Sequence, residues 1–110
     1  MYVLIVTQLL VQLPLKTISH FANYKLFLGV DSFSFENGIS TPNMEEAMLN
    51  QAMIAQANQV IAVFDSSKFN KRSFCPIANA DQIDAIVTDN NLPVGYATRL
   101  KEKNIDLYLA

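Results

Sequence analysis

Short apolar runs alternate with longer, mixed segments along the whole chain. The runs are typical of strands buried in a sheet, and they occupy residues 2–6, 25–30, 60–64, 85–88 and 105–109. Several of the segments between them place apolar residues at helical spacing, which predicts helices over residues 16–22, 43–58 and 95–103. Strands that alternate with helices predict an α/β domain with a mostly parallel sheet, right-handed crossovers and flanking helices.

Four segments give less regular patterns. Residues 9–13 resemble a second strand of the apolar opening, and residues 73–78 resemble an edge strand, because Pro76 has no N–H to donate. Residues 31–40 are rich in Ser, Gly, Asn and Asp and predict a loop. Residues 81–84 predict a turn or a short helix.

The helix predicted over residues 43–58 has two alternative starts and one apolar stripe. Pro42 would be the first helical residue behind a Thr41 cap, or Asn43 would cap the helix with Glu46 as its reciprocal partner. The stripe should face the core, and its members are Met44, Ala47, Met48, Ile54 and Ala55, widened by Leu49 and Met53.

The composition narrows the class of protein. A chain of 110 residues forms one domain, and with 51% hydrophobic and 16% charged residues it should not be disordered. The net charge of −2 has the wrong sign for neutralising DNA phosphates, so we expect no DNA binding by this chain alone. Gln8, Gln12 and Pro14 interrupt the apolar opening and no basic residue precedes it, so we expect neither a membrane span nor a signal peptide. The single Cys75 suits a reducing compartment, and we expect a cytoplasmic protein.

Polar residues follow two of the predicted strands, and ligands of open parallel sheets bind beyond the carboxyl ends of the strands. Gly29 and Asp31 end the first of these strands. The second is followed by Asp65-Ser66-Ser67-Lys68, where two hydroxyls, two backbone N–H groups and a mobile cation would suit a phosphate or carboxylate. Asp65 would orient Lys68 or accept a substrate hydroxyl. The alternatives are an Asx turn at Asp31 and an ordinary turn with a solvated lysine at Lys68.

Other candidates carry less chemistry. His20 stands alone, without a metal ligand or a carboxylate at useful spacing, and Cys75 is expected to be a buried, inert thiol. Glu45 and Glu46 favour the helix macrodipole, so capping is their default role. No common nucleotide or metal signature occurs in the sequence, and we expect no cofactor and no metal.

Four ordered motifs raise a resemblance to a known family. They are G-V-D at residues 29–31, E-N-G-I-S-T-P-N-x-E-E at 36–46, D-S-S-K-F at 65–69 and I-D-x-I-V-T-D at 83–89. Together they resemble the C-terminal effector-sensing domain of DeoR-type bacterial transcriptional regulators, especially the branch that controls amino-sugar or sugar phosphotransferase operons. The resemblance covers residues 25–110, and the apolar opening, residues 1–24, matches poorly and is taken as part of the same domain.

The resemblance implies a fold similar to that of ribose-5-phosphate isomerases and CoA transferases, with a phosphorylated sugar bound at the strand ends. Asp31 and Glu46 would then bind sugar hydroxyls, and Lys68 with the Ser66 and Ser67 backbone would bind charged oxygens. The full set of implied site residues is Gly29, Asp31, Glu46, Asp65, Ser66, Ser67 and Lys68.

The resemblance also sets expectations about partners. Such regulators carry an N-terminal winged helix-turn-helix, and their sensor domain opens with a strand and a phosphate loop rich in Asp, Ser, Gly and Thr. This sequence shows neither feature, so we expect a truncated module that reaches DNA only through a helix-turn-helix domain outside it. We also expect it to associate with copies of itself or with an intact regulator.

The leading hypothesis is a sugar-phosphate-sensing module that is not an enzyme. The first rival is a sugar-phosphate isomerase, in which carboxylates move protons between adjacent carbons. The isomerase pattern calls for a second carboxylate three residues before Asp31, and this chain has Leu28 there. The second rival is a structural remnant that binds no effector and pairs with an intact regulator.

Overall fold

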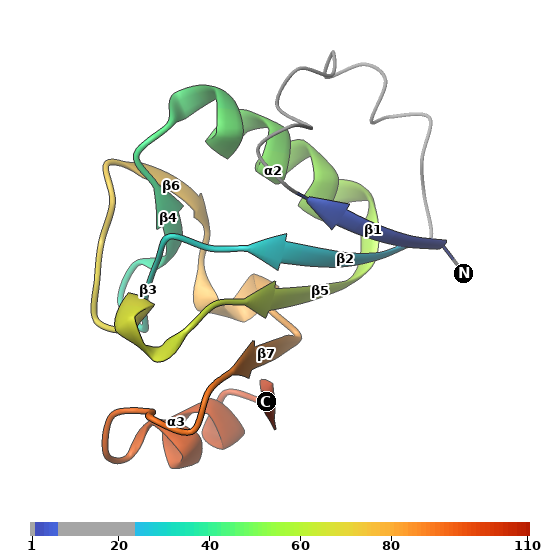
Figure 1. Cartoon of the computed structure of the whole chain (residues 1–110). Coiled ribbons are helices and arrows are strands. Elements are labelled where there is room, and N and C mark those ends of the chain that lie inside the picture. Colours follow the sequence, from blue (N-terminus) through green and yellow to red (C-terminus); the bar gives the residue numbers. More distant parts are fainter. Residues whose placement is uncertain (1, 7–23) are drawn as a thin grey trace.

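The computed structural model describes residues 2–6 and 24–110, and its largest element is a five-stranded, fully parallel sheet (Figure 1). The strands lie in the order β1-β2-β5-β7-β8. Their bounds are β1 Tyr2–Val6, β2 Tyr24–Gly29, β5 Ala57–Val63, β7 Ala85–Thr88 and β8 Asp106–Leu109. The predicted α/β class with a mostly parallel sheet is therefore confirmed.

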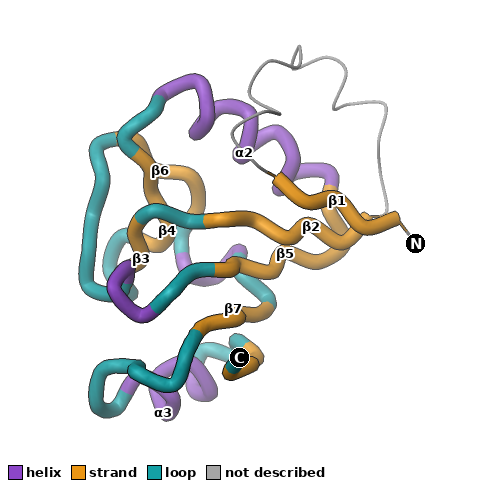
Figure 2. Tube along the Cα trace, in the orientation of Figure 1, coloured by secondary structure: helices purple, strands orange, loops and turns teal. Residues whose placement is uncertain are grey.

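A second, smaller sheet stands beyond the carboxyl ends of β2 and β5 (Figure 2). It is antiparallel, with the order β3-β4-β6, and consists of β3 Ser32–Ser34, β4 Gly38–Thr41 and β6 Cys75–Ala78. The prediction of a loop over residues 31–40 was wrong, because this segment is a β-hairpin. The prediction of an edge strand near Pro76 is confirmed, although that strand joins the second sheet instead of the parallel one.

The hairpin could be buried in spite of its polar composition because its serines find partners within the protein. The Ser32 and Ser73 hydroxyls lie 2.6 Å apart, and the Ser73 N–H donates to the Ser40 hydroxyl at 2.8 Å. Ser32 and Ser40 are both buried. A buried hydroxyl costs little once it is hydrogen-bonded, and these partners lie more than thirty residues away in sequence.

Helix α2 (Met44–Gln56) begins as one of the two predicted alternatives. Asn43 is the N-cap, and its side chain accepts a hydrogen bond from the Glu46 N–H at 2.9 Å. The helix ends two residues earlier than predicted, because Ala57 adopts an extended conformation and opens β5. The apolar stripe was predicted only in part: Met44 and Met48 are exposed, and the buried residues are Ala47, Leu49, Asn50 and Met53.

Aromatic side chains join the two sheets to helix α3 (Tyr96–Glu102). Their ring centroids lie between 4.9 and 5.8 Å apart in mostly edge-to-face pairs, and the members are Phe33, Phe35, Phe64, Phe69 and Tyr96. The Arg99 guanidinium lies 4.0 Å from the centre of the Phe35 ring, within cation–π range. The cluster fixes the loop after β5 against the hairpin, and so shapes the end of the parallel sheet.

Several further predictions can be placed. Residues 80–82 form a short 3-10 helix, η3 (Ala80–Gln82), where a turn or short helix was predicted, and Cys75 is buried as expected. The strand predicted over 9–13, the helix predicted over 16–22 and His20 lie outside the described residues. None of the described helices has the length and hydropathy needed to cross a membrane.

Candidate functional site

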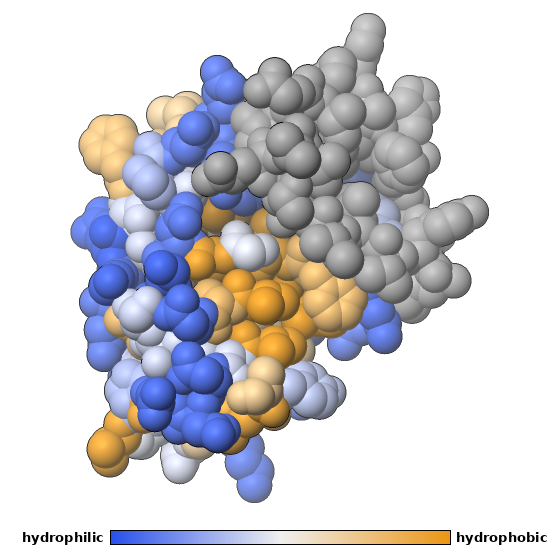
Figure 3. All heavy atoms as spheres, in the orientation of Figure 1, coloured by the Kyte–Doolittle hydropathy of each residue, from blue (hydrophilic) through white to orange (hydrophobic). Residues whose placement is uncertain are grey.

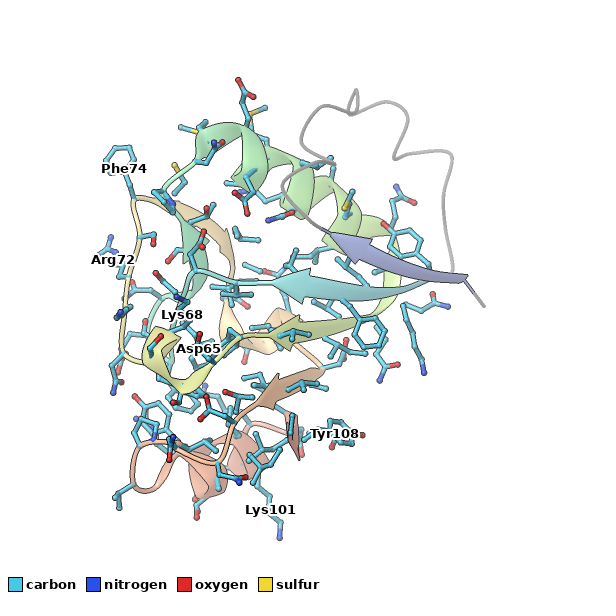
Figure 4. All side chains as sticks on the ribbon, in the orientation of Figure 1. Asp65, Lys68, Arg72, Phe74, Lys101 and Tyr108 are labelled. Atoms are coloured by element: carbon cyan, nitrogen blue, oxygen red, sulfur yellow. The ribbon has the colours of Figure 1, made fainter. Side chains whose placement is uncertain are left out.

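The carboxyl ends of β2, β5 and β7 lie side by side at one edge of the parallel sheet. Gly29 pairs with Val63, and Val63 pairs with Val87, so the segments that follow these residues leave the sheet together. Asp31, which follows β2, therefore lies at the same edge of the sheet as the loop after β5. Figure 4 labels Asp65 and Lys68 on that loop. The two polar segments predicted from the sequence are therefore neighbours in space.

The first part of this edge is a cluster formed by Asp31, Thr41 and Glu46. Thr41 ends β4, is fully buried, and donates its hydroxyl hydrogen to the Asp31 carboxylate at 2.8 Å. Glu46 lies in the first turn of α2 and is half-buried. Burial raises the pKa of Glu46, the nearby Asp31 charge raises it further, and a hydrogen bond with Thr41 opposes both. Three elements thus place two carboxyls around one hydroxyl.

The second part is the short 3-10 helix η2 (Ser66–Lys68) and the acidic residues that cap it. The Asp65 side chain is its N-cap and accepts hydrogen bonds from both the N–H and the hydroxyl of Ser67. These bonds hold the pKa of Asp65 below its ordinary value, and the nearby Lys68 charge adds a smaller effect in the same direction.

Asp89, which follows the neighbouring strand β7, is hydrogen-bonded to the same η2 loop. Its carboxylate accepts the Ser66 N–H at 2.9 Å and the Asn91 N–H at 2.9 Å. Backbone hydrogen bonds from Ser66 and Asn91 lower the pKa of Asp89. The loops after β5 and β7 are therefore tied together by one charged side chain.

This geometry changes the chemistry expected of Ser66 and Ser67. Both backbone N–H groups already donate to carboxylates, those of Asp89 and Asp65. An incoming anion would have to displace a carboxylate before it could use either donor. Lys68, which is half-buried on the same turn, is the cationic group among the predicted site residues.

Gly29 and Leu28 bear on the two rival functions. Gly29 is exposed at the end of β2. No atom of the described residues would lie within 4 Å of a Cβ built there, so close packing against them does not explain the glycine. Leu28 is fully buried in the main core. The position where an isomerase-like carboxylate was sought therefore faces away from solvent.

Sequence reasoning missed three residues of this region. Thr41 was considered only as a helix cap, and Asp89 was quoted in a motif without a role. Asn50 is fully buried on α2, and neither polar atom of its side-chain amide has a hydrogen-bond partner among the described residues. It follows Glu46 by four residues, which puts the two on the same helix face. The sequence did offer a signal for Asn50, because it is a polar residue within the apolar stripe of the predicted helix.

A separate cleft of about 400 Å³ lies between α3 and the start of β8, at the other end of the sheet from the strand-end cluster. Its lining includes Ala97, Lys101, Asn104, Asp106 and Leu107. None of the predicted site residues contributes to it. This cleft is therefore separate from the strand-end residues that the sequence predicts to bind a ligand.

Comparison with known proteins decides the family. A sequence model of the DeoR C terminal sensor domain matches residues 7–90, which is well over half of the chain. This protein belongs to the DeoR family of C-terminal sensor domains. The resemblance drawn from the four motifs is therefore confirmed.

Several regulators of this family are similar to the chain. A transcriptional repressor assigned to the aga operon of Escherichia coli O157:H7 is 40% identical over 84 residues, which is 76% of this chain and 31% of that protein. The transcriptional repressor GlcR of Bacillus subtilis is 35% identical over 83 residues, covering 76% of the chain and 32% of GlcR. The regulator GlpR of Haloferax volcanii is 40% identical over 67 residues, covering 61% and 26%. The chain spans about a third or less of the length of these relatives.

Proposed function

We propose that this DeoR sensor chain is an effector-sensing module that binds a phosphorylated sugar or amino sugar. The observation that supports this most is the meeting of two different chemistries at one edge of the sheet. The cluster of Asp31, Thr41 and Glu46 offers hydrogen-bond acceptors, and Lys68 offers a cation on the next strand end. A sugar with hydroxyls at one end and a phosphate at the other has the matching distribution of groups.

Each group has a distinct role in this proposal. Asp31 and Glu46 accept hydrogen bonds from sugar hydroxyls, and Lys68 neutralises the phosphate charge. Asp65 keeps the η2 turn in shape by capping it. The N–H groups of Ser66 and Ser67 join the phosphate only if the ligand displaces Asp89 or Asp65, so that binding would reorganise the loop.

Such a reorganisation suits a regulator better than an enzyme. A ligand shifts a protein between two states only to the extent that it binds one of them more tightly. In the free state the η2 N–H groups donate to carboxylates, and in the bound state they would donate to phosphate oxygens. The ligand would therefore bind only one of the two states of the loop. The consequence for DNA would pass to a DNA-binding domain outside this chain, through pairing with copies of the chain or with an intact regulator.

The test is ligand-dependent thermal stability of the whole 110-residue chain. Hexose and hexosamine 6-phosphates should raise the unfolding midpoint, while the unphosphorylated sugars should not, because a ligand specific for the folded state stabilises it by mass action. The Lys68→Ala variant should unfold at the same temperature without ligand and lose most of the ligand-induced shift, since a charge-assisted hydrogen bond contributes about 1.5 to 3 kcal/mol.

Lys103→Ala is the matched control, because Lys103 is exposed just beyond α3 and away from the strand ends. It should respond to every ligand as the parent does. If the Lys68→Ala variant kept the full ligand-induced shift, Lys68 would not be part of the binding site. If inorganic phosphate raised the unfolding midpoint as much as a sugar phosphate, the site would not recognise the sugar.

Two functional assays separate the proposal from its rivals. Aldose–ketose isomerisation of sugar phosphates should not exceed the buffer rate, and turnover that disappears in Asp31→Asn would show that the chain is an enzyme. The chain alone should not shift an operator fragment in a gel at moderate salt, since it is net acidic. A sequence-specific shift would contradict the separation of sensing from DNA binding.

A further inference from the structure

Two contacts of different kinds join the η2 loop to helix α3. Phe69 directly follows Lys68 and is the C-cap of η2. Its ring centroid lies 5.3 Å from that of Tyr96, the first residue of α3, in an edge-to-face pair. At the other end of η2, the Ser66 N–H donates to Asp89, which opens the segment between β7 and α3. Both ends of η2 are therefore attached to the start of α3 or to the segment that leads into it.

Helix α3 depends strongly on its tertiary contacts. It has seven residues, and a helix this short is marginal by itself in water. Its buried side chains are Tyr96 and Leu100, and hydrophilic side chains gather over the helix at the bottom of Figure 3. Tyr96 packs against Phe69 of the η2 loop and against Phe35 of the hairpin. One of the two buried side chains that hold α3 in place is therefore in direct contact with the η2 loop.

Each end of α3 is flanked by a residue in the left-handed backbone region. Gly95, the N-cap, has φ +85°, and Asn104, just beyond the helix, has φ +60°. Glycine and asparagine adopt this conformation at little cost, and Gly95 offers no side chain to cap the helix. Elements with few buried contacts open locally at a lower free energy than the core. Helix α3 can therefore loosen while the parallel sheet stays intact.

We propose that α3 is the element that responds when the strand-end site is occupied. This inference rests on the proposed function, because it names what a reorganised η2 loop changes elsewhere. A phosphate that takes the Ser66 N–H releases Asp89, and with it the segment that leads into α3. Movement of Lys68 toward the phosphate carries the next residue, Phe69, away from Tyr96. Both changes weaken the attachment of α3, so the helix is looser in the bound state.

Movement of α3 changes a surface far from the strand ends. The helix starts at Tyr96, beside Phe69, and leads to the start of β8 at the opposite edge of the sheet. Ala97 and Lys101 line the cleft of about 400 Å³ beside β8, and Figure 4 shows the Lys101 side chain extending outward from the helix. The occupancy of the strand-end site is thereby communicated to the other edge of the sheet, as a coupling between two separate sites requires.

Amide hydrogen exchange of the full chain, followed by NMR without ligand, tests the polar contact. Ser66→Pro removes the N–H that Asp89 accepts, and proline fits the first position of η2 because the preceding Asp65 is extended. The α3 amides should exchange about tenfold faster, since a hydrogen bond to a charged group is lost. Ser66→Ala is the matched control, because it keeps the N–H, and its α3 amides should exchange at nearly the rate of the parent.

The same measurement on Phe69→Leu tests the aromatic contact. Loss of the edge-to-face pair with Tyr96 should raise the exchange rates of the α3 amides by about two- to tenfold. Ile77→Val is the control, because Ile77 is buried in the main core but is not a member of the aromatic cluster. This variant should not raise the exchange rates in α3. Circular dichroism would verify that every variant is folded.

Glucosamine 6-phosphate is the probe for the bound state of the parent chain. It should raise the unfolding midpoint and at the same time speed exchange of the α3 amides. A rise of the midpoint without any change in α3 exchange overturns the inference, as do α3 rates equal to those of the parent in both Ser66→Pro and Phe69→Leu. If no sugar phosphate raises the midpoint, the proposed function itself is wrong, and the two variants show separately whether η2 holds α3.

Discussion

The two acidic clusters at the strand ends differ in what their carboxylates do. Asp65 and Asp89 accept backbone N–H groups and tie the η2 loop together, and their pKa values are lowered by those hydrogen bonds. Glu46 is half-buried beside the charge of Asp31, and its pKa is raised. The carboxylates at one edge of the sheet thus divide into two that accept backbone hydrogen bonds and one, Glu46, whose pKa is raised by burial and a neighbouring charge.

The difference should be visible in how stability depends on pH. For Asp65 and Asp89 the unfolded chain binds protons more tightly, so their stabilisation is present above their ordinary pKa and is lost as pH falls through the lowered values. For Glu46 the folded state binds the proton more tightly, so its contribution is lost as pH rises from the ordinary toward the raised pKa. Below neutral pH, the two clusters therefore change the stability of the folded state in opposite directions as the pH falls.

The largest effect on stability should come from Gly38→Ala. This change should disturb the cluster of Asp31, Thr41 and Glu46 and leave the η2 loop intact. Gly38 has φ +68°, and a Cβ there would lie 2.0 Å from the Ala78 carbonyl oxygen. Backbone strain and overpacking together should lower the free energy of unfolding by about 2 to 6 kcal/mol. Denaturant unfolding measures this loss, and NMR shifts should move at Thr41 more than at Ser67.

Gly29→Ala is the matched control for that variant. Gly29 has open space around its Cα, so alanine should leave stability unchanged or raise it by about 0.4 to 1 kcal/mol. Equal losses in both variants would show that the hairpin does not depend on the turn at Gly38.

A smaller effect should follow from Ser67→Ala, which removes a side-chain hydrogen bond to Asp65 in the η2 loop. The Ser67 hydroxyl is the largest cause of the lowered pKa of Asp65, so the variant should raise that pKa toward its ordinary value. An NMR titration of the Asp65 carboxyl measures the shift. Stability should then fall less steeply as the solution is acidified.

Ser66→Ala provides the contrast for Ser67→Ala. The Ser66 side chain contributes to the lowered pKa of Asp89, so this variant should raise the pKa of Asp89 and leave Asp65 as it is. A rise at Asp65 in both variants would mean that the loop responds as one unit.

The smallest effect should come from Asp31→Asn, which tests why the pKa of Glu46 is raised. Burial is the main cause of the raised pKa of Glu46, and the Asp31 charge is the second, so the variant should lower that pKa without returning it to normal. Thr41→Val should shift it the opposite way, because the hydroxyl that stabilises the Glu46 carboxylate is lost. A titration of Glu46 in both variants measures the shifts, and equal directions would contradict this account.

Local patterns predicted the strands of the parallel sheet and the helices among the described residues. Strands such as 85–88 were recognisable because a strand buried on both faces is apolar throughout, and Asn43 capped α2 because capping depends on residues three apart. The sequence also indicated that polar residues follow two of these strands, where ligands of parallel sheets bind, but it did not indicate which strands pair. The motifs at residues 29–31 and 65–69 indicated the family for the same reason, being local and ordered.

The tertiary structure alone decided the features that depend on distant partners. The hairpin over 31–40 was taken for a loop because its serines are stabilised by Ser73, far along the chain. The occupation of the Ser66 N–H by Asp89 depends on the pairing of two strands. The order of the five parallel strands likewise depends on pairing between distant segments, and composition carries no record of that order. Residue types determine what can be buried, whereas hydrogen bonds and strand order between distant segments decide which groups remain available.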